Sequence, residues 1–95
     1  MATPKTSGAT VGALASAATS AQMLAANPQR KGLLVTNTDA NTLYLKYGEG
    51  ATITTGYTVA IPSGGYWEMP RPVYSGVIHG IWAADGSGSA VYTEL

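Results

Sequence analysis

The chain has no cysteine and no phenylalanine, and only 11% of its 95 residues are charged. The absence of cysteine excludes disulfide bonds, thiolate metal sites and a cysteine nucleophile. Five Lys and Arg balance five Asp and Glu, so the formal net charge is zero and the chain has no electrostatic footprint for a polyanion. We therefore expect no sequence-independent binding to nucleic acid. A chain of this length holds one small domain at most.

Large side chains are scarce in the first 30 residues. No charge occurs between Lys5 and Arg30, every aromatic residue lies at or beyond Tyr44, and 18 of the first 29 residues are Ala, Ser, Thr or Gly. Such small side chains bury too little apolar area to offset the backbone entropy that ordering costs. We therefore predict that residues 1–30 form an arm that docks on another surface, beside a domain over residues 31–95.

Three structures are open for this arm. One is a signal peptide with its apolar stretch at residues 11–18, although this stretch holds a single leucine. A second is an Ala-rich helix over residues 13–26. The third is an extended segment that ends in a short strand over residues 19–24, before the turn signal Asn27-Pro28. The apolar stretch is too weak to span a bilayer, so we expect no membrane segment.

From Lys31 onward, apolar and polar residues alternate with the period of a β-strand. The pattern predicts one hairpin with strands over residues 33–37 and 43–47, and a last hairpin with strands over residues 77–84 and 90–95. Turn signals recur about every 8–12 residues, which is typical of sandwiches and small barrels. The sequence therefore predicts an all-β protein, a small antiparallel β-sandwich of jelly-roll or Ig-like type with an extended N-terminal arm. Its predicted core comprises the alternating residues Leu33, Val35, Leu43, Leu45, Val59, Ile61, Ile81 and Val91.

No group of residues in the sequence has the spacing of a catalytic or metal-binding motif. His79 is the single histidine, and the acidic residues are spread over separate predicted elements. Gly-X-Gly sequences at residues 48–50 and 86–88 have neither the third glycine nor the lysine of a phosphate-binding loop. We therefore predict that the protein is not an enzyme and uses no cofactor and no metal. His79 is interpreted as a strand residue with local hydrogen bonds.

Aromatic and cationic side chains are the remaining candidates for recognition. Tyr66, Trp67 and Tyr74 are possible exposed contacts, because such rings stack on sugars and on partner surfaces. The favoured alternative is that Trp67 and Trp82 fill a core that has no phenylalanine, while the tyrosines bury their rings and leave their hydroxyl groups at the rim. Arg30 and Lys31 form the one cluster of positive charge, where solvent exposure is favoured over contact with an acidic partner.

Residues 24–37 have the sequence LAANPQRKGLLVTN. An apolar residue and Ala-Ala-Asn-Pro, followed by arginine, an aliphatic strand and asparagine, resemble a pattern in small β-sandwich virion proteins of tailed bacteriophages and prophages. The resemblance covers residues 20–95, and in that pattern the segment before Asn-Pro is extended, which favours the strand over residues 19–24. Further matching segments lie at residues 41–48, 57–62, 64–70, 74–86 and 93–94.

The resemblance implies a capsid decoration (cement) protein, which binds the major capsid protein lattice at the capsid surface of the virion and stabilises the head by non-covalent contacts. It also implies a homo-oligomer, with a trimer favoured, made in the host bacterial cytoplasm. Alternatives are a neck, tail or fibre-associated virion protein and a carbohydrate-binding adhesion module. Small size without disulfides or metal independently favours self-association. The residues expected to bind the capsid or a neighbouring subunit are Val11, Leu14, Met23, Leu24, Arg30 and Lys31.

Overall fold

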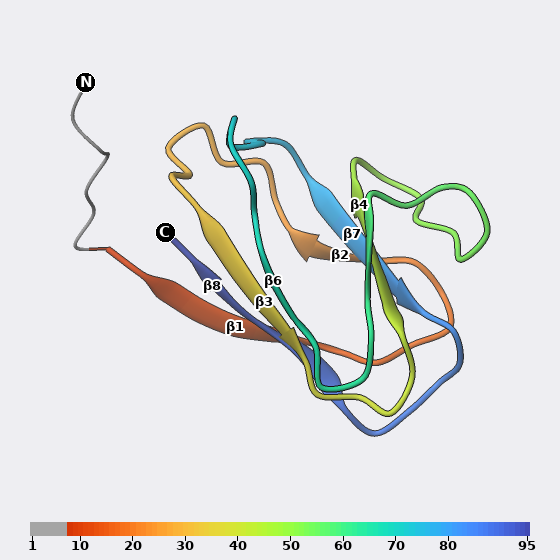
Figure 1. Ribbon diagram of the computed structural model, residues 1–95. Coiled ribbons are helices and arrows are strands. Elements are labelled where there is room, and N and C mark those ends of the chain that lie inside the picture. The colour runs from red at the N-terminus through yellow and green to blue at the C-terminus, as the bar shows by residue number, and fades with distance from the viewer. Residues whose placement is uncertain (1–7) are drawn as a thin grey trace.

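Eight strands form two antiparallel four-stranded sheets that pack face to face in a computed structural model describing residues 8–95 (Figure 1). Sheet A has the order β1-β8-β3-β6, and sheet B has the order β2-β7-β4-β5. The described residues include no helix, and hence none able to cross a membrane. The predicted all-β sandwich is confirmed. The strands are β1 (Thr10–Ala15), β2 (Ala21–Leu24), β3 (Leu33–Asn37), β4 (Leu43–Tyr47), β5 (Val59–Ile61), β6 (Tyr66–Glu68), β7 (Ile78–Trp82) and β8 (Ser89–Glu94).

The pairing follows a simple rule, because β1 pairs with β8, β2 with β7, β3 with β6 and β4 with β5. The chain is thus a long antiparallel ribbon that doubles back between β4 and β5. Successive pairs of the ribbon fall in alternate sheets, and the pairs β3·β8 and β4·β7 complete each sheet. This rolled ribbon has the strand order of a jelly roll, one of the two sandwich types that the sequence predicts.

Both predicted hairpins are wrong, because their strands lie in different sheets. Strand β3 belongs to sheet A and β4 to sheet B, and β7 and β8 are divided in the same way. Alternation identifies each strand but not its partner, since pairing depends on contacts between residues far apart in sequence. The turns after β3 and β7 carry the chain from one layer to the other.

The core lies between the sheets and contains most of the predicted residues. Leu33, Val35, Leu43, Leu45 and Ile61 are at most 2% exposed, and Val59 packs against them partly buried. In β7 and β8 the prediction selects the wrong face: Ile81 is partly exposed, and Val91 is 39% exposed. A shift of one residue moves every side chain of a strand to its opposite face. The residues buried there instead are Ile78, Trp82 and Ala90.

The N-terminal segment supplies one edge strand to each sheet. Strand β1 pairs with β8, and β2 pairs with β7 close to where the sequence predicts a strand at residues 19–24. The Ala-rich helix does not form, because residues 10–15 and 21–24 pair with β8 and β7, and this pairing overrides the helix propensity of alanine. Residues 10–15 and 21–24 are thus extended, and they pair with strands of residues 31–95 within the same sandwich. Residues 1–7 of the predicted arm lie outside the described residues.

Asn37, at the end of β3, is a buried polar residue that bridges the two sheets. Its amide nitrogen donates hydrogen bonds to the carbonyl oxygens of Asn41 at 2.8 Å and Ile61 at 3.0 Å. Its amide oxygen accepts a hydrogen bond from Nε1 of Trp82 at 3.1 Å, and Trp82 is a core residue of sheet B. Hydrogen bonds of this kind offset the cost of burying the amide. Asn37 therefore connects β3 to both β5 and β7.

Asp39 fixes the turn between β7 and β8 against the turn between β3 and β4. Its carboxylate accepts hydrogen bonds from the backbone N–H groups of Asn41 at 2.9 Å and Gly88 at 2.8 Å. These hydrogen bonds hold the pKa of the Asp39 carboxyl below its ordinary value. Gly88 lies so close to the backbone of Asp39 that any side chain at this position would overlap it. Only glycine fits there without a shift of one turn.

Replacing Leu45 by Ala should lower the free energy of unfolding by about 2–4 kcal/mol, because Leu45 is fully buried and its truncation leaves a cavity. Urea denaturation followed by tryptophan fluorescence measures this loss. Thr36→Ala, on the exposed face of β3, is the control and should change the free energy of unfolding little. Equal effects of the two variants would contradict the assigned core.

Asp39→Asn should lower the melting temperature at pH 7, because the carboxylate that accepts the two N–H groups is lost. The folded-state pKa of Asp39 lies below its ordinary value of 3.8, so the carboxylate stabilises the fold above pH 3.8. That contribution is lost as the pH falls from 3.8 through the folded-state pKa. The difference in melting temperature between wild type and variant should therefore shrink below pH 3.8. A difference that stays constant from neutral to strongly acidic pH would contradict this role of Asp39.

Candidate functional site

The outer face of sheet A carries two rows of side chains that are almost free of charge. One row consists of Val11, Thr93, Leu34 and Glu68, and the next consists of Ala13, Val91, Thr36 and Tyr66. We call these eight residues the outer patch. Glu68, on the edge strand β6, is its single charged member. The outer patch is therefore a mostly apolar surface with one charge at its rim.

Large hydrophobic side chains of the outer patch are exposed to solvent. Val11 is 69% exposed, Tyr66 is 61% exposed and Val91 is 39% exposed. Within the described residues, these three are the majority of the large exposed hydrophobic residues, the others being Ile53 and Tyr57. Exposed apolar residues that gather on one face, in contrast to scattered ones, are typical of a surface that binds a partner.

The apolar residues that the sequence assigns to partner binding divide between surface and core. Val11 projects from the outer patch, whereas Leu14 on the same strand points inward and packs against the core. Met23 and Leu24 are 6% and 8% exposed and belong to the protein's own core. This placement differs from the prediction that all four side chains fill pockets of a partner. The reason is that β1 and β2 pair with strands of the same chain.

Arg30 is buried, in contrast to the predicted solvent exposure. Its Nε donates a hydrogen bond to Oε2 of Glu94 at 2.8 Å, which forms an ion pair with no exposure of the arginine side chain. The two other guanidinium nitrogens donate to backbone carbonyl oxygens of Tyr74 at 2.7 Å, Gly76 at 3.1 Å and Ala25 at 2.9 Å. Arg30 thus joins the end of β8 to the connections β2–β3 and β6–β7. It does not reach an acidic partner in this arrangement.

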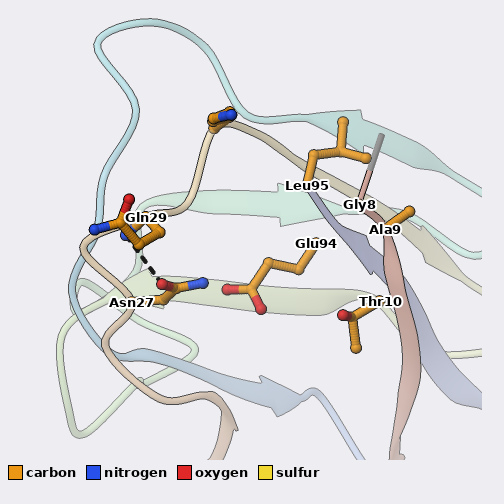
Figure 2. Close-up of a pocket in the computed structure, with 8 residues that line it drawn as sticks. Gly8, Ala9, Thr10, Asn27, Gln29, Glu94 and Leu95 are labelled. Atoms are coloured by element: carbon orange, nitrogen blue, oxygen red, sulfur yellow. Dashed lines mark hydrogen bonds between the residues drawn. The ribbon is translucent and has the colours of Figure 1, made fainter. Parts of the chain in front are cut away.

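Two hollows adjoin Lys31, at the end of the sandwich where β1 begins and β8 ends (Figure 1). The first, of about 260 Å³, also involves the exposed Arg71 and its neighbours Pro72 and Val73. The second, of about 240 Å³, is shown in Figure 2, where the Glu94 side chain extends toward Asn27. Lys31 and Arg71 make the first hollow basic, so it suits an acidic group. The residues lining the second hollow are Gly8, Ala9, Thr10, Asn27, Gln29, Lys31, Glu94 and Leu95.

The three aromatic residues predicted as contacts lie in different environments. Tyr66 is exposed on the outer patch. Trp67 is partly buried and packs against the core, with its ring 6.2 Å from that of Tyr47. Tyr74 stacks on Tyr47 with a centroid distance of 4.3 Å and nearly parallel planes, and burial raises the pKa of Tyr47. The three rings therefore do not form one exposed platform.

The structure brings few chemically reactive groups together. His79 Nδ1 lies 3.2 Å from Oγ of Ser20, which also accepts a hydrogen bond from the N–H of Ala51. Across the described residues, no three His, Asp or Glu side chains are grouped closely enough to hold a metal ion.

Sequence reasoning misses most members of the outer patch. Leu34, Thr36 and Thr93 belong to strands whose other face is apolar, so they read as ordinary surface positions. Val91 is predicted to lie in the core, because alternation alone does not show whether a valine is on the buried or the exposed face of its strand. Arg71 is missed because Pro70 and Pro72 on either side indicate only a break in pairing. The low charge on the outward positions of β1, β3 and β8 is the signal that identifies the patch.

Replacing Arg30 by Met should destabilise the fold by about 3–5 kcal/mol, because Glu94 and three carbonyl oxygens lose their partner. Lys31→Met, at the adjacent exposed position, is the matched control and should cost under about 1 kcal/mol. Thermal and chemical denaturation of both variants measure the difference. A loss in Arg30→Met as small as in Lys31→Met would show that the buried ion pair does not hold this end together.

Comparisons with family models, with curated proteins and with solved structures gave no match to this chain.

Proposed function

We propose that this protein is a bacteriophage virion structural protein of the capsid decoration (cement) type. It binds the major capsid protein lattice through the outer patch and stabilises the head by non-covalent contacts. The sequence resemblance over residues 20–95 supports the virion role. The exposed apolar side chains of Val11, Tyr66 and Val91 support a binding role for this face of the sandwich.

The outer patch has the composition of the centre of a protein–protein interface. Such centres are poor in charged residues and rich in aromatic and apolar ones, with charges at the rim. Tyr66 and Val91 each pair with Thr36, one on either side of β3, and Glu68 lies at the edge of the patch. Burying this face against a capsid would release water from apolar surface at roughly 25 cal/mol per Å². Jelly rolls also occur in lectins and cupins, so the topology alone selects no function.

Self-association is part of the proposal. The chain is small and has no cysteine, so its core is limited and contacts with further copies add burial. The expected location is the capsid surface, after synthesis in the cytoplasm of the bacterial host. A copy number of three follows from the resemblance alone, and a position at the neck, tail or fibre is the alternative within the virion.

A carbohydrate-binding adhesion module is less well supported. Such a module presents aromatic rings to solvent as a platform for sugar rings. Trp67 packs against the core and Tyr74 stacks on Tyr47, so Tyr66 is the one predicted ring that is mostly exposed. A single exposed tyrosine within an apolar face fits a protein partner better than a glycan.

Val91→Lys and Tyr66→Ser should each weaken binding to particles, since they place a charge or a cavity in the outer patch. Loss of a central contact costs on the order of tenfold in affinity. The measurement adds each variant to purified particles that lack this protein and quantifies the bound copies after pelleting. Point variants are used because removing the N-terminal segment would also remove β1 from sheet A.

Ala60→Lys is the matched control, because Ala60 is an exposed residue of β5 in sheet B. It should bind particles as the wild type does, and all three variants should keep the wild-type circular dichroism spectrum. Equal occupancy by wild type, Val91→Lys and Tyr66→Ser would contradict binding through the outer patch. No binding by the wild type would contradict the decoration role and favour another position in the virion.

A further inference from the structure

The four edge strands of the sandwich differ in how well they are protected. Strands β5 and β6 have three residues each, and Pro70 and Pro72 follow β6. Strand β2 has four residues, and its pairing shifts register between Gln22 and Leu24. Short strands, prolines and bulges are the usual means by which proteins prevent pairing at a sheet edge. Three of the four edges therefore carry at least one such protection.

Strand β1 has none of these protections. It is six residues long, has the sequence TVGALA, and pairs with β8 in unbroken register from Thr10 to Ala15. Its edge opposite β8 is the outer edge of sheet A. An edge strand leaves a row of N–H and C=O groups without a strand partner, and β1 has no charged residue or proline to oppose pairing.

We propose that a second copy of this chain binds this edge, with β1 antiparallel to β1 around a two-fold axis. The two copies of sheet A then form one continuous eight-stranded sheet. This inference concerns the free protein and does not rest on capsid binding. It gives two copies where the sequence resemblance implies three.

The faces of the sheet restrict the register of this pairing. Residues opposite each other in an antiparallel pair point to the same face, so an outward residue of one copy must lie opposite an outward residue of the other. This requires one residue of β1 to lie opposite its own copy, at the two-fold axis. With the axis at Ala13, Val11 lies opposite Ala15 on the outer face, and Gly12 lies opposite Leu14 on the inner face. The Tyr92 ring occupies the space where a side chain of Gly12 would be, so the partner's Leu14 meets an aromatic ring.

A second copy fits this edge better than an unrelated strand for two reasons. Two identical strands without charge do not repel each other, which removes the usual obstacle to self-pairing. The pairing also places the two outer patches side by side, since Val11 and Ala13 belong to the patch. The contact is isologous and closes at two copies.

Charge substitution at Ala13 tests the pairing directly. Ala13 is exposed, so Ala13→Lys and Ala13→Glu should each fold with a melting temperature near that of wild type. Each places two like charges opposite each other at the axis and should weaken dimerisation on the order of tenfold. Analytical ultracentrifugation should give twice the mass of the 9.7 kDa chain for wild type and a mixture shifted to monomer for each variant. Mixing the two variants should restore the dimer.

A single cysteine provides an independent measurement, because the chain has none. Opposed residues of an antiparallel pair have Cα atoms about 4.5–5.5 Å apart, which suits a disulfide bond. Ala13→Cys should therefore form a covalent dimer under mild oxidation, whereas Thr36→Cys, exposed on the interior strand β3, should form far less.

Three results would overturn the proposal. They are a wild type that stays monomeric at high concentration, an assembly that Ala13→Lys and Ala13→Glu leave unchanged, and equal cross-linking of Ala13→Cys and Thr36→Cys. An unchanged trimer would instead support the copy number implied by the resemblance. Because no particles are present, these results are separate from the test of capsid binding.

Discussion

The hydrogen bonds of one buried asparagine determine how the two sheets meet. Asn37 ends β3 in sheet A, and its amide reaches the carbonyl of Ile61 at the end of β5 and the indole of Trp82 in β7. Asp39, two residues later, binds the turn that leads from β7 to β8. With these hydrogen bonds formed, the chain passes from β3 in sheet A to β4 in sheet B and does not fold back on β3 as a hairpin. The rolled ribbon, and with it the position of β8 between β1 and β3 in sheet A, depends on this network.

The other end of the sandwich uses charge in place of amide groups. Arg30 binds Glu94 and three backbone carbonyl oxygens, so the last residues of the chain are held against the connections β2–β3 and β6–β7. The two polar centres lie at opposite ends of β3. Between them the core is apolar, and sheet A is free to present a face with almost no charge. The rows of the outer patch are continuous because β1, β8 and β3 keep an unbroken register there.

Much of this fold can be predicted from alternation, and the remainder depends on interactions between distant residues. Strands β3 and β4 and their inner faces follow from clear alternation such as that of Leu33 and Val35. Strand β1 is not predicted as a strand, because its residues are small and do not alternate clearly. Strand β7 has an isoleucine on each face, Ile78 on one and Ile81 on the other, so alternation does not show which face is buried. The buried face is the one from which Trp82 donates a hydrogen bond to Asn37. The burial of Arg30 cannot be predicted from the sequence either, because its ion-pair partner Glu94 lies 64 residues further along the chain. Of the candidate contact residues, Val11 and Tyr66 are exposed on the outer patch. The patch itself arises only when four strands are set in register.

The central claim is that this sandwich lies on a phage capsid with the outer patch against the shell. The most direct measurement is a cryo-electron microscopy reconstruction of the virion whose genome encodes the chain, at a resolution that distinguishes the two sheets. The account predicts density for the sandwich on the outer surface of the head, with sheet A facing the capsid protein and Tyr66 and Val91 buried in the contact. Density at the neck or tail, or a head-bound sandwich with sheet A turned to solvent, would contradict it.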